Sequence, residues 1–519
     1  MEQLQSKKRA ASTMSRRSFI SAGVGMGMIS IIPSHVFAAK KQGLVAPSDK
    51  ICLLHIGCGT QSLVESNALL KSPDIEIVGL ADPNRESYDY IYWQQFSVRD
   101  HVRALLNEPT WLEGKNGIPG GREVMKYVVE TYYRKNRTGY KGAIAVKEDY
   151  RELLATMKDI DAVKIMTPDH HHAYQAIDCL KRGKHVIMHK PLGNKMTEAM
   201  KVVDVAKASK AATFMLGFIA FGDGNMEQIR KWIDAGAIGK LKTVHNWSSR
   251  PVWPQYPVIP TDKPPIPDGL NWDLWLGPAE MRDYHPYYTH ATFRGWYEFG
   301  AGSLADMGYY SLLPVFNMLK LDSATAVSTR FSRVIGLKNN VPSEIVNDYS
   351  YPMAAAYKFD IPYKDKSGVI CLQWHDGGFK PETPEGYDQD DLPIEGMMFV
   401  GDKGAIVADF GGQNPVIVGE RSSAYASIKG SPIADNPRTI LPNGNERWLQ
   451  TWIDDCRGKG RGFGSFEHAK EVNETFNLGS VSLMCGGEKL LYNPATRTIT
   501  NHAEANKLLT RKIRKGWEM

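Results

Sequence analysis

From Lys50 onward, short apolar runs alternate with amphipathic stretches. Apolar runs over 51–56 and 75–80 flank a helical pattern over 63–71, which predicts a strand, a helix and a second strand. The alternation returns after residue 145, where we expect helices over 150–158, 172–182 and 197–209, separated by strands over 162–166 and 185–189. Strands that alternate with helices of this length predict a doubly wound, parallel α/β sheet. We assign it to a domain of residues 49–210.

One segment interrupts this pattern. Residues 87–140 are rich in aromatic and charged residues and show no clear alternation. We therefore expect them to form a helical insertion within the first domain.

The pattern changes after Thr213. The strand-like stretches that follow are separated by long irregular segments, and they cover 242–248, 354–359, 368–374, 397–400 and 405–408. They predict an α+β domain over residues 211–519, built on a large, mainly antiparallel open sheet. Seven prolines between Pro251 and Pro267 exclude a helix or a central strand there. That stretch is expected to be an extended arm around the domain or a neighbouring subunit.

The first 38 residues are typical of a secretory signal. They combine a basic start, an apolar stretch from Phe19 to Ile32 and an ending in small residues at Ala38. The pair Arg16-Arg17 resembles a twin-arginine signal, which exports folded proteins, whereas an ordinary Sec signal is the alternative. We expect a periplasmic or otherwise exported protein. The apolar stretch is too short and glycine-rich for a stable membrane span.

The net charge and the spacing of the cysteines bear on nucleic-acid binding and metal binding. The net charge of the 519 residues is +6, and the leader's five basic residues and one acidic residue account for +4 of it. The remaining +2 gives no indication of nucleic-acid binding. The six cysteines show no CxxC or metal-type spacing, so we expect mostly buried thiols and leave a disulfide open.

A glycine turn joins the first predicted strand to its helix. Gly57 and Gly59 permit a tight turn, and Thr60 and Gln61 open the helix, whose N-terminus can bind a dinucleotide pyrophosphate. Ser62 stands where this pattern usually has glycine or alanine, so slightly looser packing is expected. The four residues from the turn and helix start are predicted cofactor contacts.

Asp82 ends the second predicted strand, 23 residues after Gly59. A carboxylate there can accept hydrogen bonds from the adenosine ribose, and it would repel a 2′-phosphate. This favours NAD over NADP, although nearby Arg85 leaves NADP open as a second cofactor. The alternative is an ordinary turn capped by aspartate.

Two further segments end strands at the edge of the sheet where ligands bind. In the segment Thr167–His172, consecutive histidines point in different directions and no matching ligand set is apparent, so we predict no metal site. Instead, we expect this segment to line the cofactor cleft through Thr167, Pro168, Asp169 and His172. In the second segment, Lys190 precedes the rigid Pro191. Its ammonium group could stabilise alkoxide character on a reacting hydroxyl, unless it is simply exposed to solvent.

The order of the glycine turn, Ala81-Asp82-Pro83-Asn84, Thr167–His172 and Lys190-Pro191 resembles the superfamily of glucose-fructose oxidoreductase, inositol dehydrogenase and rhizopine catabolism proteins (Gfo/Idh/MocA). Motifs in the second half resemble its exported bacterial members; they lie at 235–239, 272–278, 300–308, 399–404 and 504–509. The resemblance implies a Rossmann domain, a carbohydrate-binding domain and a homo-oligomer.

The resemblance also implies a lysine, an aspartate and a histidine or tyrosine around the nicotinamide, matched by Lys190, Asp306 and Tyr310. Tyr310 is then the expected proton acceptor, because the ammonium group and an oxidised nicotinamide would increase its acidity. Asp306 and Tyr310 would share a helix face, with Pro314 kinking or ending that helix. His189 departs from the family, which usually has glutamate there, and Tyr310 matches the glucose-fructose oxidoreductase branch.

The leading hypothesis is an NAD-dependent oxidoreductase acting on a secondary hydroxyl of a sugar or glycoside, with a tightly bound, internally recycled cofactor. One alternative is a glycoside hydrolase that uses NAD for transient oxidation, elimination and re-reduction. Another is a noncatalytic sugar-binding relative. Aromatic residues between Trp247 and Trp296 could stack on sugars, but most are expected to pack in the interior.

Overall fold

The computed structural model describes residues 49–216, 225–251, 258–363, 368–419, 422–425, 427, 444–460, 462 and 464–519. Residues 51–519 form one compact unit. The predicted signal segment, Trp253 and Tyr256 lie outside the described residues.

The first sheet is parallel throughout and has the strand order β3-β2-β1-β4-β5-β6. This confirms the predicted doubly wound fold. Most of its strands are short and largely buried, as expected where helices cover both faces, whereas the edge strand β3 is partly exposed. The elements in chain order are β1 (Ile51–Ile56), α3 (Thr60–Lys71), β2 (Ile75–Ala81), β3 (Ala145–Lys147), α6 (Tyr150–Thr156), β4 (Ala162–Ile165), α7 (Asp169–Lys181), β5 (His185–His189), α8 (Met196–Ala208) and β6 (Thr213–Leu216).

The predicted insertion contains two helices, α4 (Ser97–Leu106) and α5 (Arg122–Asn136). Both pack against α3, and α5 also contacts β2. An irregular stretch between β2 and α4 runs beside the glycine turn, where the Tyr90 ring lies 3.2 Å from the position of a Cβ on Gly59. The insertion therefore contributes to the surroundings of the nucleotide-binding turn.

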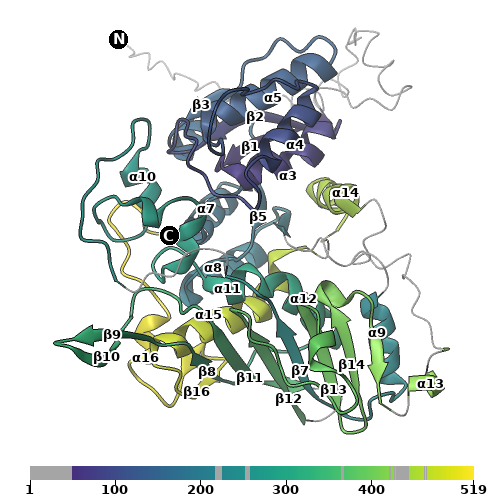
Figure 1. The fold of residues 1–519 in the computed structure, drawn as a ribbon. Coiled ribbons are helices and arrows are strands. Elements are labelled where there is room, and N and C mark those ends of the chain that lie inside the picture. Colours follow the sequence, from purple (N-terminus) through teal and green to yellow (C-terminus); the bar gives the residue numbers. More distant parts are fainter. Residues whose placement is uncertain are drawn as a thin grey trace, which may run out of the picture. The chain divides into compact units, whose positions relative to one another are not determined.

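The second sheet has the order β15-β14-β13-β7-β12-β11-β8-β16-β17. Neighbouring strands are antiparallel except β7 and β12, which confirms the mainly antiparallel prediction. The strands are β7 (Leu241–Trp247), β8 (Ala326–Phe331), β11 (Ala355–Tyr363), β12 (Gly368–His375), β13 (Gly396–Gly401), β14 (Ala405–Asp409), β15 (Val416–Val418), β16 (Leu490–Asn493) and β17 (Thr498–Ile499). A separate hairpin of β9 (Val334–Lys338) and β10 (Val341–Ile345) projects from this domain (Figure 1).

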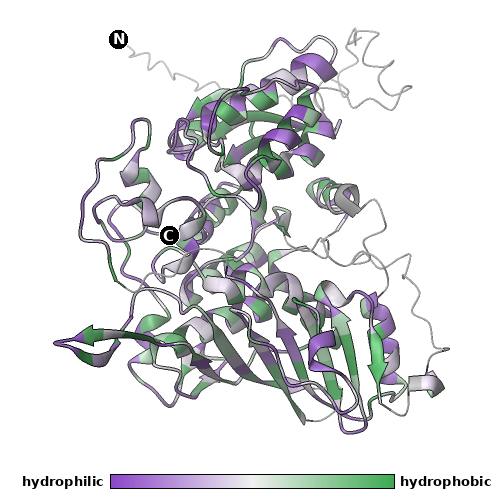
Figure 2. Cartoon of the chain, viewed as in Figure 1, coloured by the Kyte–Doolittle hydropathy of each residue, from purple (hydrophilic) through white to green (hydrophobic). Residues whose placement is uncertain are grey.

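Helices cover one face of this sheet (Figure 1), where alternate residues such as Tyr357, Phe359 and Ile361 of β11 are buried. Strands of both sheets carry hydrophobic residues (Figure 2), and one continuous core runs from Ile51 to Leu509. The helices of this half are α9 (Asn225–Asp234), α10 (Trp272–Leu276), α11 (Gly302–Asp306), α12 (Gly308–Leu319), α13 (Ser422–Tyr425), α14 (Gly444–Cys456), α15 (Lys470–Met484) and α16 (Ala505–Leu508). No helix in the described ranges is both long and apolar enough to cross a membrane.

The single helix expected to carry both Asp306 and Tyr310 is interrupted between them. Pro314 lies inside α12, which continues to Leu319, and the interruption falls earlier, at Met307. Burial of Leu312, Leu313 and Val315 in the core stabilises the helix despite the hydrogen bond that proline removes. Asp306 and Tyr310 consequently lie on two consecutive helices.

Most of the predicted sugar-stacking aromatics are packing residues. Trp247, Trp296 and Tyr288 are buried, and Trp272 stacks on Trp275 with ring centroids 4.7 Å apart. All six cysteines are free thiols, of which Cys58 and Cys179 are fully buried.

Candidate active site

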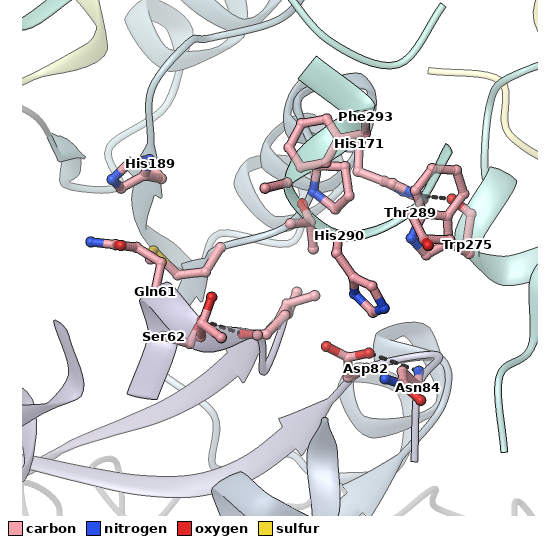
Figure 3. A pocket seen from close by; sticks show the side chains of 18 of the residues that line it. Gln61, Ser62, Asp82, Asn84, His171, His189, Trp275, Thr289, His290 and Phe293 are labelled. Atoms are coloured by element: carbon pink, nitrogen blue, oxygen red, sulfur yellow. Dashed lines mark hydrogen bonds between the residues drawn. The ribbon is translucent and has the colours of Figure 1, made fainter. Parts of the chain in front are cut away.

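A cavity of about 610 Å³ lies at the carboxyl edge of the parallel sheet. Residues 270–310 of the second domain form its other wall (Figure 3). Ten of the predicted site residues line it, namely Gly57, Gly59, Thr60, Gln61, Asp82, Thr167, Pro168, Lys190, Asp306 and Tyr310. Four others, Arg85, Asp169, His172 and Pro191, are not among its lining residues.

The glycine turn forms a cradle at the start of α3. Gly57 has φ +88°, and a Cβ there would lie 2.5 Å from the backbone oxygen of Met166. The N-terminus of α3 has no side-chain cap, so its first amide groups can donate to an anion. Ser62 is buried and its hydroxyl donates to the Gly57 oxygen at 2.7 Å. It therefore fastens the turn, in contrast to the looser packing that we expected.

Asp82 connects β2 to this turn. One carboxylate oxygen accepts a hydrogen bond from the Cys58 amide at 2.6 Å, and the other accepts one from the Asn84 amide at 2.7 Å (Figure 3). Burial raises the pKa of Asp82. The carboxylate thus caps a turn and faces the cavity. Arg85 turns to Asp268, with 2.5 Å between Nη2 and Oδ2.

In the wall of the same cavity, the Lys190 ammonium forms a buried ion pair with Asp306. Arg294 Nε lies 3.3 Å from the same carboxylate oxygen. Burial would raise the pKa of Asp306, but the charges of Lys190 and Arg294 outweigh it and hold this pKa well below its usual value. Burial also lowers the pKa of Lys190, and Asp306 opposes that effect. The arrangement places two cations around one carboxylate.

Tyr310 lies beside Lys190, and further groups that the sequence did not indicate act on its acidity. Its ring lies 5.0 Å from Lys190 Nζ, so the cation faces the ring. Burial, followed by the charges of Glu65 and Asp306, raises the pKa of Tyr310 well above its ordinary value. The hydroxyl instead lies 3.5 Å from Nε2 of His189.

The segment Thr167–His172 has a mainly structural role. Helix α7 already begins at Asp169, whose carboxylate accepts a hydrogen bond from the Ala301 amide at 3.0 Å. Burial raises the pKa of Asp169 to about 6. His171 Nε2 donates to the Trp275 oxygen at 2.7 Å, and His172 Nδ1 donates to the Pro191 oxygen at 2.7 Å. In the described part of the chain, no His, Cys, Asp or Glu cluster is arranged for a metal ion.

Sequence reasoning missed several lining residues. Tyr90, Ile91, Tyr92 and Trp93 come from the insertion, and Trp517 comes from the segment after α16. The Trp517 ring lies 4.4 Å from the Arg151 guanidinium and 5.6 Å from the His171 ring. No local motif marks Trp517, because the segment reaches the cavity only through tertiary contacts.

A second pocket of about 420 Å³ adjoins the first and shares Trp93 and Arg250 with it. The guanidinium of Arg250 lies 3.9 Å from the Trp93 ring centroid and its Nε is 3.3 Å from Glu395. Glu395, Asp409 and Gln413 add polar groups to its wall. The cavity is therefore continued by an aromatic and polar surface.

Two regions match known protein families. Residues 124–218 match the Gfo/Idh/MocA oxidoreductase family described as an NAD-binding Rossmann fold, and residues 223–334 match its C-terminal alpha/beta domain.

Individual relatives match over shorter stretches. An inositol 2-dehydrogenase of Rhodococcus erythropolis is 31% identical over 97 residues, covering 19% of this chain and 28% of the relative. Glycosyl hydrolase family 109 protein 1 of Shewanella is 32% identical over 120 residues, covering 23% of this chain and 25% of the relative. The chain thus spans about a quarter of the length of these two curated relatives.

The fold also matches a solved structure, the WlbA dehydrogenase of Chromobacterium violaceum in complex with NADH and UDP-GlcNAcA. The TM-score is 0.51 at 14% identity, covering 90% of this chain and 99% of that chain. The chain therefore contains the NAD-binding Rossmann domain and the C-terminal alpha/beta domain of the Gfo/Idh/MocA oxidoreductase family.

Proposed function

We propose that this protein oxidises a secondary hydroxyl of a sugar or glycoside, with NAD bound in the cavity as the hydride acceptor. One observation carries the proposal: a glycine cradle at a helix N-terminus and the buried Lys190–Asp306 pair line the same cavity. The family matches support a nicotinamide cofactor, and the inositol dehydrogenase relative supports a polyol or sugar substrate.

The residues present fit such a cofactor. The first amides of α3 would hold the pyrophosphate, and the missing side chain of Gly57 allows close approach. Asp82 would bind the adenosine ribose, and Arg85, paired with Asp268, does not line the cavity. This arrangement favours NAD over NADP. When bound, the nicotinamide would accept a hydride from the substrate carbon.

The side chains around Lys190 would handle the hydroxyl oxygen and its proton. The Lys190 ammonium donates a hydrogen bond to that oxygen and stabilises the negative charge that develops as the proton leaves. Asp306 positions the Lys190 ammonium, and Arg294 adds a second positive charge beside the Asp306 carboxylate. Tyr310 presents a neutral hydroxyl to the same region, because burial raises its pKa.

The adjoining pocket supports an NAD-dependent glycoside hydrolase as the second candidate. A substrate oxidised beside Lys190 could extend past Trp93 and Arg250, where an aglycone or second sugar would meet Glu395 and Gln413. The similarity to a family 109 glycosyl hydrolase points in the same direction. In this case, oxidation, elimination of the aglycone, addition of water to the resulting double bond and re-reduction would leave the cofactor unchanged overall.

We also propose that the protein is exported through its first 38 residues, carries its cofactor with it and forms a homo-oligomer. Native mass spectrometry of protein purified without added nucleotide would test the last two points. We expect a mass increment equal to NAD on each subunit, whereas subunits that lack a dinucleotide would contradict a tightly held cofactor. Immunoblotting of cell fractions would test export.

The activity can be tested with a panel of monosaccharides and matching p-nitrophenyl glycosides. The absorbance band of reduced nicotinamide reports net oxidation, and p-nitrophenol reports cleavage. We expect Lys190→Met to abolish turnover, whereas the matched control Lys512→Met, in a side chain that is 86% exposed, should not change it. Sugar binding without either product in the wild-type protein would indicate a noncatalytic relative.

A further inference from the structure

We propose that Glu65 and His189 form a proton-accepting dyad, in which His189 takes the proton of the substrate hydroxyl through Tyr310. The inference rests on the proposed function and deepens it by adding two residues to the site. It also explains what a histidine does immediately before Lys190.

The geometry of the dyad is compact. His189 ends β5 and lines the cavity, on the same side as Gln61 (Figure 3). Its Nε2 lies 3.5 Å from the Tyr310 hydroxyl and 3.3 Å from Oε1 of Glu65. Gln61 donates a hydrogen bond to the same Glu65 oxygen at 2.6 Å, one helical turn away on α3. Glu65 is therefore fixed from two sides.

Glu65 carries a negative charge at neutral pH. Burial would raise the pKa of Glu65, but the charge and hydrogen bond of His189, with the charge of Lys164, lower it to about 2. The carboxylate consequently stabilises a proton on Nε2 without accepting that proton itself.

The shared nitrogen allows two alternative hydrogen bonds. A neutral His189 protonated on Nδ1 can accept a hydrogen bond from Tyr310 at Nε2. Once Nε2 is protonated, it can donate to Glu65. When Nε2 of His189 receives the proton, its hydrogen bond from Tyr310 is therefore replaced by a charge-assisted hydrogen bond to Glu65.

Other charged groups around the dyad are consistent with these roles. The Lys190 ammonium lies over the Tyr310 ring, and Asp306 is paired with that ammonium. His172 of α7 is close enough to interact electrostatically with His189. Burial lowers the pKa of His172 to about 3, so it stays neutral.

Behind Glu65 lie Lys164 of β4 and His55 of β1, both fully buried. Their side-chain nitrogens have no hydrogen-bond partner among the described residues. Burial lowers the pKa of Lys164 to about 8 and that of His55 well below its usual value. Lys164 thus adds a positive charge that favours ionised Glu65, and His55 is neutral.

The proposed step conserves atoms and charge. The substrate O–H bond breaks and its proton moves to the Tyr310 oxygen, while the Tyr310 proton moves to Nε2 of His189. The substrate carbon gives its hydride to the cofactor, and the C–O single bond becomes a carbonyl. Tyr310 stays neutral throughout, so no phenolate forms in a buried position where it would be disfavoured.

The test compares His189→Gln and Glu65→Gln with the wild-type protein and with Glu152→Gln, which removes an acid from an exposed ion pair. Single-turnover reduction of bound NAD is measured against pH, with the substrate identified in the glycoside panel. We expect His189→Gln to slow this step by about 100-fold. Glu152→Gln should keep the wild-type rate.

Two further readouts separate this role from a structural one. Calorimetric NAD affinity should be the same in all four proteins. In cofactor-free protein, ¹³C NMR of the Glu65 carboxyl should show its pKa rising in His189→Gln, because burial then opposes ionisation with less compensation.

The outcomes are distinguishable. If the wild-type protein turns over and His189→Gln keeps the wild-type rate, the dyad is excluded and the proposed function stands. If the wild-type protein neither reduces NAD nor cleaves any glycoside, both proposals fail.

Discussion

Replacing Arg511 with methionine should destabilise the folded chain more than any change to its neighbours. Arg511 Nε lies 2.6 Å from Glu198 Oε1, and the two side chains are only 3% and 2% exposed. Methionine keeps an apolar stem but removes the cation, which leaves Glu198 buried with the Tyr174 hydroxyl as a donor at 2.9 Å. Breaking a buried ion pair from one side costs about 3–5 kcal/mol.

The structure places the expected loss toward the lower limit. Lys195 is half-buried nearby. Desolvation and the charge of Arg511 lower its pKa, whereas Glu298 and Glu198 raise it. When the guanidinium is absent, Lys195 can hold its proton more firmly and partly compensate the carboxylate. We therefore expect a loss of about 3 kcal/mol in the free energy of unfolding.

Urea unfolding followed by tryptophan fluorescence measures this loss, and Lys512→Met provides the matched control. Lys512 pairs with Glu280 at 3.1 Å, but the side chains are 86% and 58% exposed, so removing this pair should cost less than about 1 kcal/mol. Adding Glu198→Gln to Arg511→Met should recover part of the stability, because the unpaired buried charge is then gone. Equal midpoints for the two single variants would refute the reasoning.

Three further predictions follow from the site and the core. Trp517→Ala should weaken NAD binding about tenfold in calorimetry, because the cavity loses an aromatic wall, and unchanged affinity would place the nucleotide elsewhere. Gly57→Ala should abolish NAD binding and lower the melting temperature, because the new Cβ would lie 2.5 Å from the Met166 oxygen and the backbone φ is +88°. Normal NAD binding by this variant would argue against the cradle. Burial raises the pKa of Asp376 to about 7, so the free energy of unfolding should fall by up to about 4 kcal/mol as pH rises from about 4 through 7. In Asp376→Asn, the urea midpoints should depend less on pH. Identical pH profiles for the two proteins would contradict this prediction.

The parts of the fold that the sequence predicted are those with local signals. The turn from β1 to α3 and the position of Asp82 follow from strand ends, glycines and spacing within one βαβ unit. Lys190 follows from the same logic, because parallel strands present their carboxyl ends at one edge. By contrast, β8 and β16 pair across more than 150 residues of sequence, and neither has a distinctive pattern.

The remaining site residues depend on distant partners. Glu65 has the sequence context of an ordinary polar residue on a surface helix, and only the fold brings it to His189. The sequence also could not reveal that burial and the charges of Glu65 and Asp306 raise the pKa of Tyr310. The break between α11 and α12 at Met307 had no signal in the sequence, and α12 continues through Pro314 because core packing outweighs the local preference.

The walls of the cavity come from residues as far apart as Gly57, Lys190, Asp306 and Trp517. Such a site has almost no short-range contacts of its own, so it should be among the last features to assemble as the chain folds. A nucleotide that binds only the assembled cavity stabilises the folded chain. At a free concentration of 100 times its dissociation constant, it would add about 2.7 kcal/mol to the free energy of unfolding. Resistance to proteases should therefore increase across both domains at once when NAD is present.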